Sequence, residues 1–282
     1  MAMGLLAAIP FDISTSMGEN VYTTKAAYIE HHGDDIKTLV VGSCLASFCF
    51  NSLLLGDSAY NTGIAGQSLF FDVEFLKREI PRMENLRTLI YPLHYNLHLS
   101  DSLAFKTANR AAFLTFRNYR YWKIPQTDKP WEIVYHSALA AGEFTYRNCQ
   151  SNPDTSTRGY MGIRGMYYNG KVDLGQNPPM QPDTGKCIAL LQEIARLCYE
   201  KNIRFIVVVP PMPDTYINYM SEEGRNNLQL IADAVKDKYP MAYKNYLTDA
   251  DYRNDSLYLD WNHLNHEGAT LFAQRVKEDF DL

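Results

Sequence analysis

Few folds can accommodate residues 203–209, an almost wholly apolar run that Pro210 and Pro211 bring to an end. A strand with apolar side chains on both faces is typical of the centre of a parallel sheet, because helices cover both faces of such a sheet. The preceding residues, 186–202, carry apolar side chains on one helical face: Ile188, Leu191, Ile194, Ala195 and Cys198. The two patterns predict a helix that leads into a central parallel strand.

The same alternation fills residues 34–99. Three strands and two helices are predicted there: strands at 38–42, 59–62 and 87–91, and helices at 44–53 and 69–80. Strand, helix and strand at this spacing imply parallel pairing with right-handed crossovers. Towards the C-terminus, the patterns predict helices at 221–239 and 266–280 and a weaker strand at 241–247.

These elements predict one α/β domain over residues 1–282, with a doubly wound, five-stranded parallel sheet and an insertion after the third strand. The insertion, residues 100–182, is rich in Tyr, Arg and Trp, and it contains one plausible helix at 131–141. Its second part lacks a clear period, which is typical of a functional lid or of partial disorder. Tyr and Arg in the insertion could stack on sugar rings or bind anions, or could simply pack over the sheet edge.

Charge and hydropathy exclude several classes of protein. The 27 basic and 32 acidic residues give a net charge of −5 without a long basic run, which argues against nucleic-acid binding. No apolar stretch reaches the ~18 residues of a membrane span. Residues 1–11 lack the preceding Lys or Arg of a signal peptide, although they could remain from a trimmed targeting segment. Five irregularly spaced cysteines without a CxxC pair exclude a zinc ribbon or a thioredoxin motif.

Reactive side chains follow the predicted strands. Gly42, Ser43 and Cys44 come after the first strand, residues 61–66 after the second, 94–96 after the third and 260–263 after the fifth. Ligands of open parallel sheets bind at the carboxyl ends of the strands, so these groups are expected at one edge. A nucleophile, a base with its orienting acid and backbone donors are the parts that acyl transfer needs.

The chain resembles the SGNH (GDSL-like) hydrolases, and more closely a subgroup in cell-envelope proteins of Bacteroides-type bacteria. The family's first block, Gly-Asp-Ser-Leu, corresponds here to Gly42-Ser43-Cys44-Leu45. Its second block, which supplies a glycine, looks like residues 61–66. Its last block is similar to Asp260-Trp-Asn-His263, which Leu-Asn and then Gly268 follow. The resemblance covers residues 34–96 and 183–282. Two departures stand out: Cys44 occupies the place of the family's serine, and the third block, here His94-Tyr-Asn96-Leu, lacks its glycine.

The resemblance implies that Cys44, or the neighbouring Ser43, is the nucleophile. His263 would be the general base and Asp260 its orienting acid. The N–H groups of Cys44 and Gly66 and the amide of Asn96 would bind the oxyanion. The implied substrates are O-acyl esters, such as acetyl groups of a carbohydrate, and no cofactor, metal, nucleic-acid partner or stable membrane span is expected.

Alternatives remain open at each position. Cys44 could be a buried filler at a helix start, Gly66 an ordinary turn glycine and Asn96 a loop cap. His266 is a second candidate base, while a metal site lacks a third ligand beside His263 and His266. The chain could also be a catalytically degenerate protein that binds or helps assemble an envelope glycan. The subgroup implies an extracytoplasmic location, whereas free cysteines are more typical of a reducing compartment.

Overall fold

The computed structural model describes residues 21–94, 157–164, 168–172 and 183–282. These residues form one sheet of five parallel strands in the order β2-β1-β3-β4-β5. The strands are β1 (Thr38–Val40), β2 (Ala59–Asn61), β3 (Thr88–Pro92), β4 (Arg204–Val209) and β5 (Ala242–Asn245). This order is that of a flavodoxin-like doubly wound sheet, so the predicted fold class and the predicted strands are confirmed.

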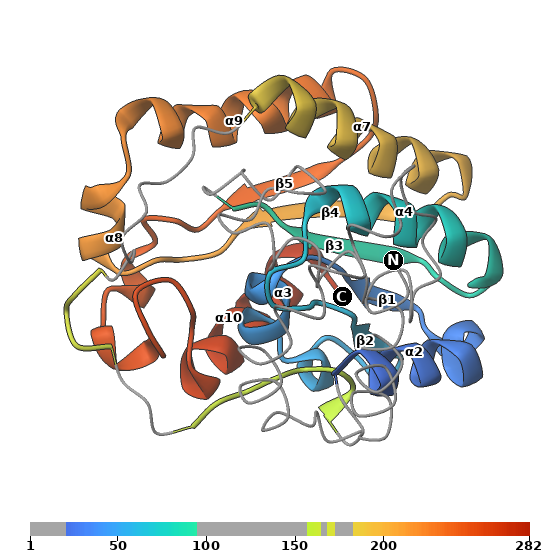
Figure 1. Cartoon of the computed structure of the whole chain (residues 1–282), viewed down its shortest axis with the longest axis horizontal. Coiled ribbons are helices and arrows are strands. Elements are labelled where there is room, and N and C mark those ends of the chain that lie inside the picture. Colours follow the sequence, from blue (N-terminus) through green and yellow to red (C-terminus); the bar gives the residue numbers. More distant parts are fainter. Residues whose placement is uncertain (1–20, 95–156, 165–167, 173–182) are drawn as a thin grey trace, which may run out of the picture.

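Helices cover both faces of the sheet (Figure 1). One face carries α4 (Leu69–Glu79), α7 (Thr184–Glu200) and α9 (Glu222–Lys236). The other carries α2 (Val21–His32), α3 (Cys44–Cys49) and α10 (His266–Phe280). The shorter elements are α8 (Asp214–Tyr219) and the 3-10 turns η1 (Gly33–Asp35), η2 (Ser52–Leu54), η3 (Ile80–Arg82), η6 (Ala250–Tyr252) and η7 (Asp255–Leu257).

Side-chain caps define where three of these helices begin. Asp183 accepts a hydrogen bond from the N–H of Lys186 at the start of α7, and Ser221 accepts one from Gly224 at the start of α9. Asn265 accepts two, from Glu267 and Gly268, at the start of α10. Each bond satisfies a backbone donor that has no partner inside the helix. The last of these caps lies two residues after His263, so it also fixes the loop that carries this histidine.

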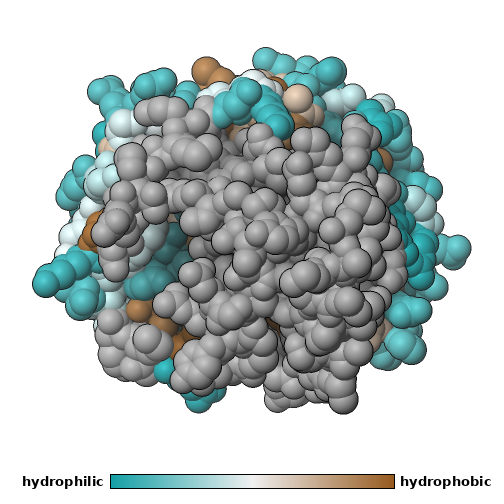
Figure 2. Space-filling view, in the orientation of Figure 1, coloured by the Kyte–Doolittle hydropathy of each residue, from teal (hydrophilic) through white to brown (hydrophobic). Residues whose placement is uncertain are grey.

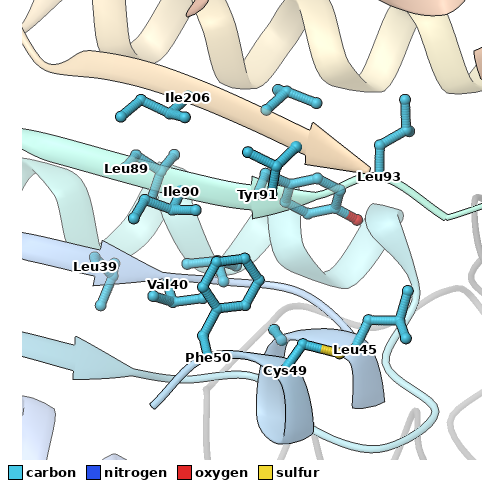
Figure 3. Close-up of a cluster of buried hydrophobic side chains, with 14 of the residues drawn as sticks. Leu39, Val40, Leu45, Cys49, Phe50, Leu89, Ile90, Tyr91, Leu93 and Ile206 are labelled. Atoms are coloured by element: carbon cyan, nitrogen blue, oxygen red, sulfur yellow. The ribbon is translucent and has the colours of Figure 1, made fainter. Parts of the chain in front are cut away.

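The core lies between the sheet and its helices. Five of the six β4 side chains are buried, as the apolar run predicts for a central strand. Figure 3 shows β1, β3 and β4 contributing Leu39, Val40, Leu89, Ile90 and Ile206 to this core. From α3, Leu45 and Cys49 are buried in the same cluster. The packing therefore anchors the helix that begins at Cys44.

Residues 157–164, called the edge segment below, lie against the outer strand β2. The N–H of Asn61 donates to the carbonyl of Arg158 at 3.0 Å, and the Ser52 hydroxyl donates to the same carbonyl at 2.9 Å. Gly159 has a φ of +82°, and a Cβ there would lie 2.1 Å from the Asn61 oxygen, so only glycine fits. The predicted helix at 131–141 and most of the insertion lie outside the described residues.

Two helices, α2 and α8, were not expected from the sequence. The buried face of α2 consists of Val21, Tyr22, Lys25 and Ile29, so a lysine interrupts the apolar pattern by which a helix is recognised. The six-residue α8 begins directly after Pro213, in a stretch where three prolines indicate a loop. Tertiary contacts, rather than periodicity, stabilise both helices.

The part of the surface that the described residues form in Figure 2 is mostly hydrophilic, with scattered apolar side chains. Within the described ranges, no helix combines the length and the apolarity needed to traverse a lipid bilayer. Isolated exposed apolar residues such as Leu53 and Leu230 are ordinary features of a protein surface.

Candidate active site

A tight turn places Cys44 at the carboxyl end of β1. Gly42 has a φ of +142°, and its carbonyl accepts a hydrogen bond from Ile64 at 3.0 Å. An L-residue rarely adopts this conformation, so the turn requires glycine. Ser43 then precedes α3, of which Cys44 is the first residue. Because β2 and β3 flank β1 on opposite sides, Cys44 lies where the strand order reverses, the usual ligand site of such sheets.

Asp260 and His263 form a hydrogen-bonded pair. The His263 Nδ1 lies 2.8 Å and 2.9 Å from the two carboxylate oxygens of Asp260. One of these oxygens also accepts the backbone N–H groups of Asn262 and His263, each at 2.9 Å. Burial raises the pKa of Asp260. The hydrogen bond and charge of His263, together with these two N–H groups, lower it by more, so the net pKa lies below the ordinary value. Asp260 is therefore an ionised acceptor that fixes the orientation of the imidazole.

The other ring nitrogen of His263, Nε2, is buried and has no hydrogen-bond partner among the described residues. Since Nδ1 holds its proton toward Asp260, the neutral ring presents its lone pair at Nε2. The thiol of Cys44 interacts electrostatically with this ring, although the two groups do not meet the geometry of a formed hydrogen bond. Burial lowers the pKa of His263, but the charges of Cys44 and Asp260 and their hydrogen-bonding potential raise it above its ordinary value.

The surroundings of Cys44 favour its thiolate. Burial raises the pKa of the thiol, but the charge of His263 and the nearby donor groups of His263, Ser43 and the Gly66 backbone lower it, and the net pKa lies below the ordinary value. Gly66 has a φ of +82°, a conformation that favours glycine, so its N–H can point toward the sulfur. A cysteine with a cationic neighbour and directed N–H groups has the setting of a reactive thiol.

Ser43, the alternative nucleophile, lies differently. Its side chain is buried, it does not cap α3, and its hydroxyl is 4.0 Å from the Cys44 sulfur. The electrostatic coupling of His263 is with Cys44. Of the two adjacent residues, Cys44 is thus the one whose side chain is brought to the histidine.

The loop after β2 is fixed to α3 by a buried asparagine. The Asn61 amide donates to the carbonyls of Ala46 and Phe50 at 2.7 Å and 2.9 Å, and its oxygen accepts the N–H of Gly63 at 2.9 Å. Gly63 lies so close to α3 that a Cβ there would be 2.5 Å from the Ala46 Cβ. The predicted second block therefore contacts α3 directly, and this contact determines where Gly66 lies.

Two further α3 side chains contact the histidine loop. The Phe48 ring meets the His263 ring edge-on, with centroids 5.1 Å apart. Burial raises the pKa of the Cys49 thiol to about 12, and the nearby backbone N–H of Leu264 partly offsets this rise. Phe48 lies four residues after Cys44, so helical spacing could have indicated it, whereas the sequence carries no such signal for Cys49.

The remaining candidates are placed as follows. His94 is buried at the end of β3, whereas Asn96, the third expected oxyanion donor, lies outside the described residues. His266 is the first residue of α10, and its ring lies 3.4 Å from both the Tyr160 hydroxyl and the Arg164 guanidinium. Its imidazole thus contacts the edge segment rather than Asp260. No group of three potential metal-ligating side chains occurs in the described parts of the chain.

Among the solved structures that this chain resembles, one matches over 99% of this chain and 99% of its own length. It comes from Streptococcus pneumonia and is provisionally described as a platelet activating factor, with a TM-score of 0.50 and 10% sequence identity. No family model matches the chain. No curated protein matches it either. At this identity, the structural likeness establishes the α/β fold alone.

Proposed function

We propose that the protein is a thiol-dependent, SGNH-like acyl hydrolase or acyltransferase. One observation carries the proposal: the buried Nε2 of the Asp260-bound His263, which has no partner among the described residues, faces the Cys44 thiol, and the Gly66 N–H is directed toward the same sulfur. A nucleophile, a base and an acid that orients the base are the minimum that covalent acyl transfer requires. The fold is the one found in the structural neighbour.

In the first half-reaction, the Cys44 thiolate attacks the carbonyl carbon of an ester, and the carbonyl electrons move to the oxygen. The N–H groups of Cys44 and Gly66 stabilise this oxyanion, with Asn96 as a further candidate donor. As the carbon–oxygen bond breaks, protonated His263 gives its Nε2 proton to the departing alkoxide. The products are a free alcohol and an acyl thioester on Cys44.

In the second half-reaction, neutral His263 takes a proton from water or from an acceptor hydroxyl, whose oxygen attacks the thioester carbon. The carbon–sulfur bond then breaks, and the thiolate returns beside the protonated imidazole. Water as acceptor gives a carboxylic acid, and an alcohol gives a new ester. Asp260 keeps Nδ1 protonated through both steps, so that Nε2 is the nitrogen that exchanges protons.

The proposed substrates are O-acyl groups, acetyl groups in particular, on a carbohydrate of the cell envelope. The similarity of residues 42–45 and 260–268 to the SGNH family supports this substrate class. The residues beside the thiol, Gly42, Ser43 and Gly66, are small, which suits a compact acyl group. A protein that has kept the fold only to bind or assemble a glycan would show no turnover.

The test is acetyl transfer from p-nitrophenyl acetate, followed by intact mass spectrometry. The native chain should release p-nitrophenol and form an acetyl thioester on Cys44, and a Cys44→Ala variant should do neither. Ser43→Ala is the matched control, because it truncates the adjacent residue; it should keep most of the activity. An acetyl group on Ser43, or equal rates in native protein and Cys44→Ala, would overturn the assignment. Absence of turnover in every form, with substrate analogues still bound, would favour the glycan-binding alternative.

A further inference from the structure

Lys25 is fully buried, with 0% of its surface exposed, on the inner face of α2. No carboxylate among the described residues pairs with it. Its Nζ donates a 2.5 Å hydrogen bond to the backbone carbonyl of Gly63. A buried amine without a counter-ion destabilises a fold unless it makes a specific contact, and this contact lies in the loop that ends at Gly66.

The same carbonyl has a second donor. The Ser47 hydroxyl, which is also 0% exposed, donates to the Gly63 oxygen at 2.5 Å. Ser47 lies on α3, one helical turn after Cys44, and its own carbonyl accepts the N–H of Met161 from the edge segment at 3.0 Å. The Gly63 oxygen is thus the point where α2, α3 and the loop after β2 are joined.

We propose that Lys25 is a positioning residue of the active site: with Ser47, it holds the Gly63 carbonyl and thereby directs the Gly66 N–H at Cys44. The inference rests on the proposed function of Cys44. Only two residues separate Gly63 from Gly66, and one of them, Ile64, is bonded through its N–H to the Gly42 carbonyl beside the nucleophile. A displacement of Gly63 therefore passes directly to the donor that faces the sulfur.

The burial of the amine supports this role. It lowers the pKa of Lys25 from 10.5 to about 7, so the buried amine gives up its proton far more readily than a free lysine and can still donate when neutral. A methionine at position 25 would fill the same space but would have no hydrogen-bond donor for the Gly63 carbonyl. A lysine is a costly core residue, and the bond to Gly63, rather than packing, accounts for a lysine at this position. The residues of α2 lie outside the stretches that resemble the SGNH family.

The test compares Lys25→Met and Ser47→Ala, each of which removes one donor to Gly63. Ser52→Ala is the control, because Ser52 is also 0% exposed and its hydroxyl also donates to backbone carbonyls, those of Thr157 and Arg158. The readouts are the thiolate absorbance of Cys44 near 240 nm as a function of pH, the kcat and KM for p-nitrophenyl acetate, and the urea midpoint.

Both test variants should raise the apparent pKa of Cys44 and lower kcat by about tenfold or more, with little change in KM, because a donor displaced by a fraction of an ångström is lost to the transition state. The control should change the urea midpoint alone. Lower midpoints with an unchanged Cys44 titration and kcat would overturn the inference and leave Lys25 a purely structural residue. If Lys25→Met does not fold, Ser47→Ala decides.

The titration also separates this inference from the proposed function. If the native protein does not turn over ester, the proposed function fails, but the Cys44 pKa of the variants still tests whether Lys25 positions Gly66. If the native protein turns over ester and the variants match it in kcat and Cys44 titration, only the positioning role fails.

Discussion

Adding one methyl group at Gly63 should disturb the candidate active site more than its size suggests. In Gly63→Ala, the new Cβ would lie 2.5 Å from the Ala46 Cβ, 2.6 Å from the Ser47 nitrogen and 2.9 Å from the Ala46 carbonyl carbon. All three atoms belong to α3, and two of them are backbone. No flexible side chain can move aside, so the helix or the loop must shift as a unit.

The size of the shift follows from these contacts. Ordinary van der Waals contact begins near 3.4 Å, so the deficit is 3.4 − 2.5 = 0.9 Å. The Asn61 amide bonds both the loop and α3, and this limits how the displacement can spread. Overpacking of a core contact by one methyl destabilises by about 1–3 kcal/mol. A catalytic geometry displaced by about 1 Å loses on the order of 100-fold in rate.

Urea unfolding and the rate of Cys44 alkylation by iodoacetamide measure the two effects. The matched control is Gly33→Ala, where the nearest atom to a new Cβ is the Met83 Cγ at 3.9 Å. Adding Ala46→Gly to Gly63→Ala removes the shortest contact and should restore part of the alkylation rate. The reasoning is refuted if Gly63→Ala matches Gly33→Ala in both the urea midpoint and the reactivity of Cys44.

Three further changes test charges rather than shape. Asp260→Asn should keep the fold but lower the acyl-transfer rate by roughly 10³–10⁴-fold, since the ring of His263 loses the acceptor that sets its tautomer; single-turnover kinetics at equal urea midpoints would check this. The pKa of Lys25 falls from 10.5 to about 7 on folding, so between these pH values the unfolded chain binds a proton that the folded chain does not. The free energy of unfolding should therefore rise with pH in this range by about 1.4 kcal/mol per pH unit. Urea titrations of the native protein and of Lys25→Met should differ by that slope. Asp72 is 2% exposed and accepts a hydrogen bond from the Tyr91 hydroxyl, and burial raises its pKa well above 3.8. The folded chain therefore keeps a proton that the unfolded chain releases, and the free energy of unfolding falls as pH rises above about 4. Asp72→Asn should remove this fall, and an unchanged pH profile of stability would contradict the reasoning.

The sequence predicts the sheet well because the strands carry their signal locally. The apolar run at 203–209 is typical of a central strand, and β4 is buried over all but its first residue. The α2 helix escaped prediction because one of its buried positions is Lys25, whose burial depends on a carbonyl 38 residues away. No local pattern contains such a contact.

In the candidate site, too, local spacing predicts some contacts and not others. The spacing of Asp260 and His263 predicts their pairing, because the two residues share one loop and the structure bonds them. The approach of Cys44 to this pair, and of the Gly66 N–H to the sulfur, depends on how three strand ends meet. The contact of Phe48 with His263 joins α3 to a loop more than 200 residues away, and it is visible only in three dimensions.

The edge segment also determines how the molecule can meet copies of itself. An open outer strand is a template for strand addition and aggregation, because its backbone groups lack partners. At the β2 edge, the Arg158 carbonyl already occupies the N–H of Asn61, and the left-handed Gly159 bends the covering chain away from a regular ladder. The opposite edge, β5, is only four residues long, so it offers a short template. Loss of the edge segment, by proteolysis or mutation, should therefore convert a protected sheet into one that recruits strands from its neighbours.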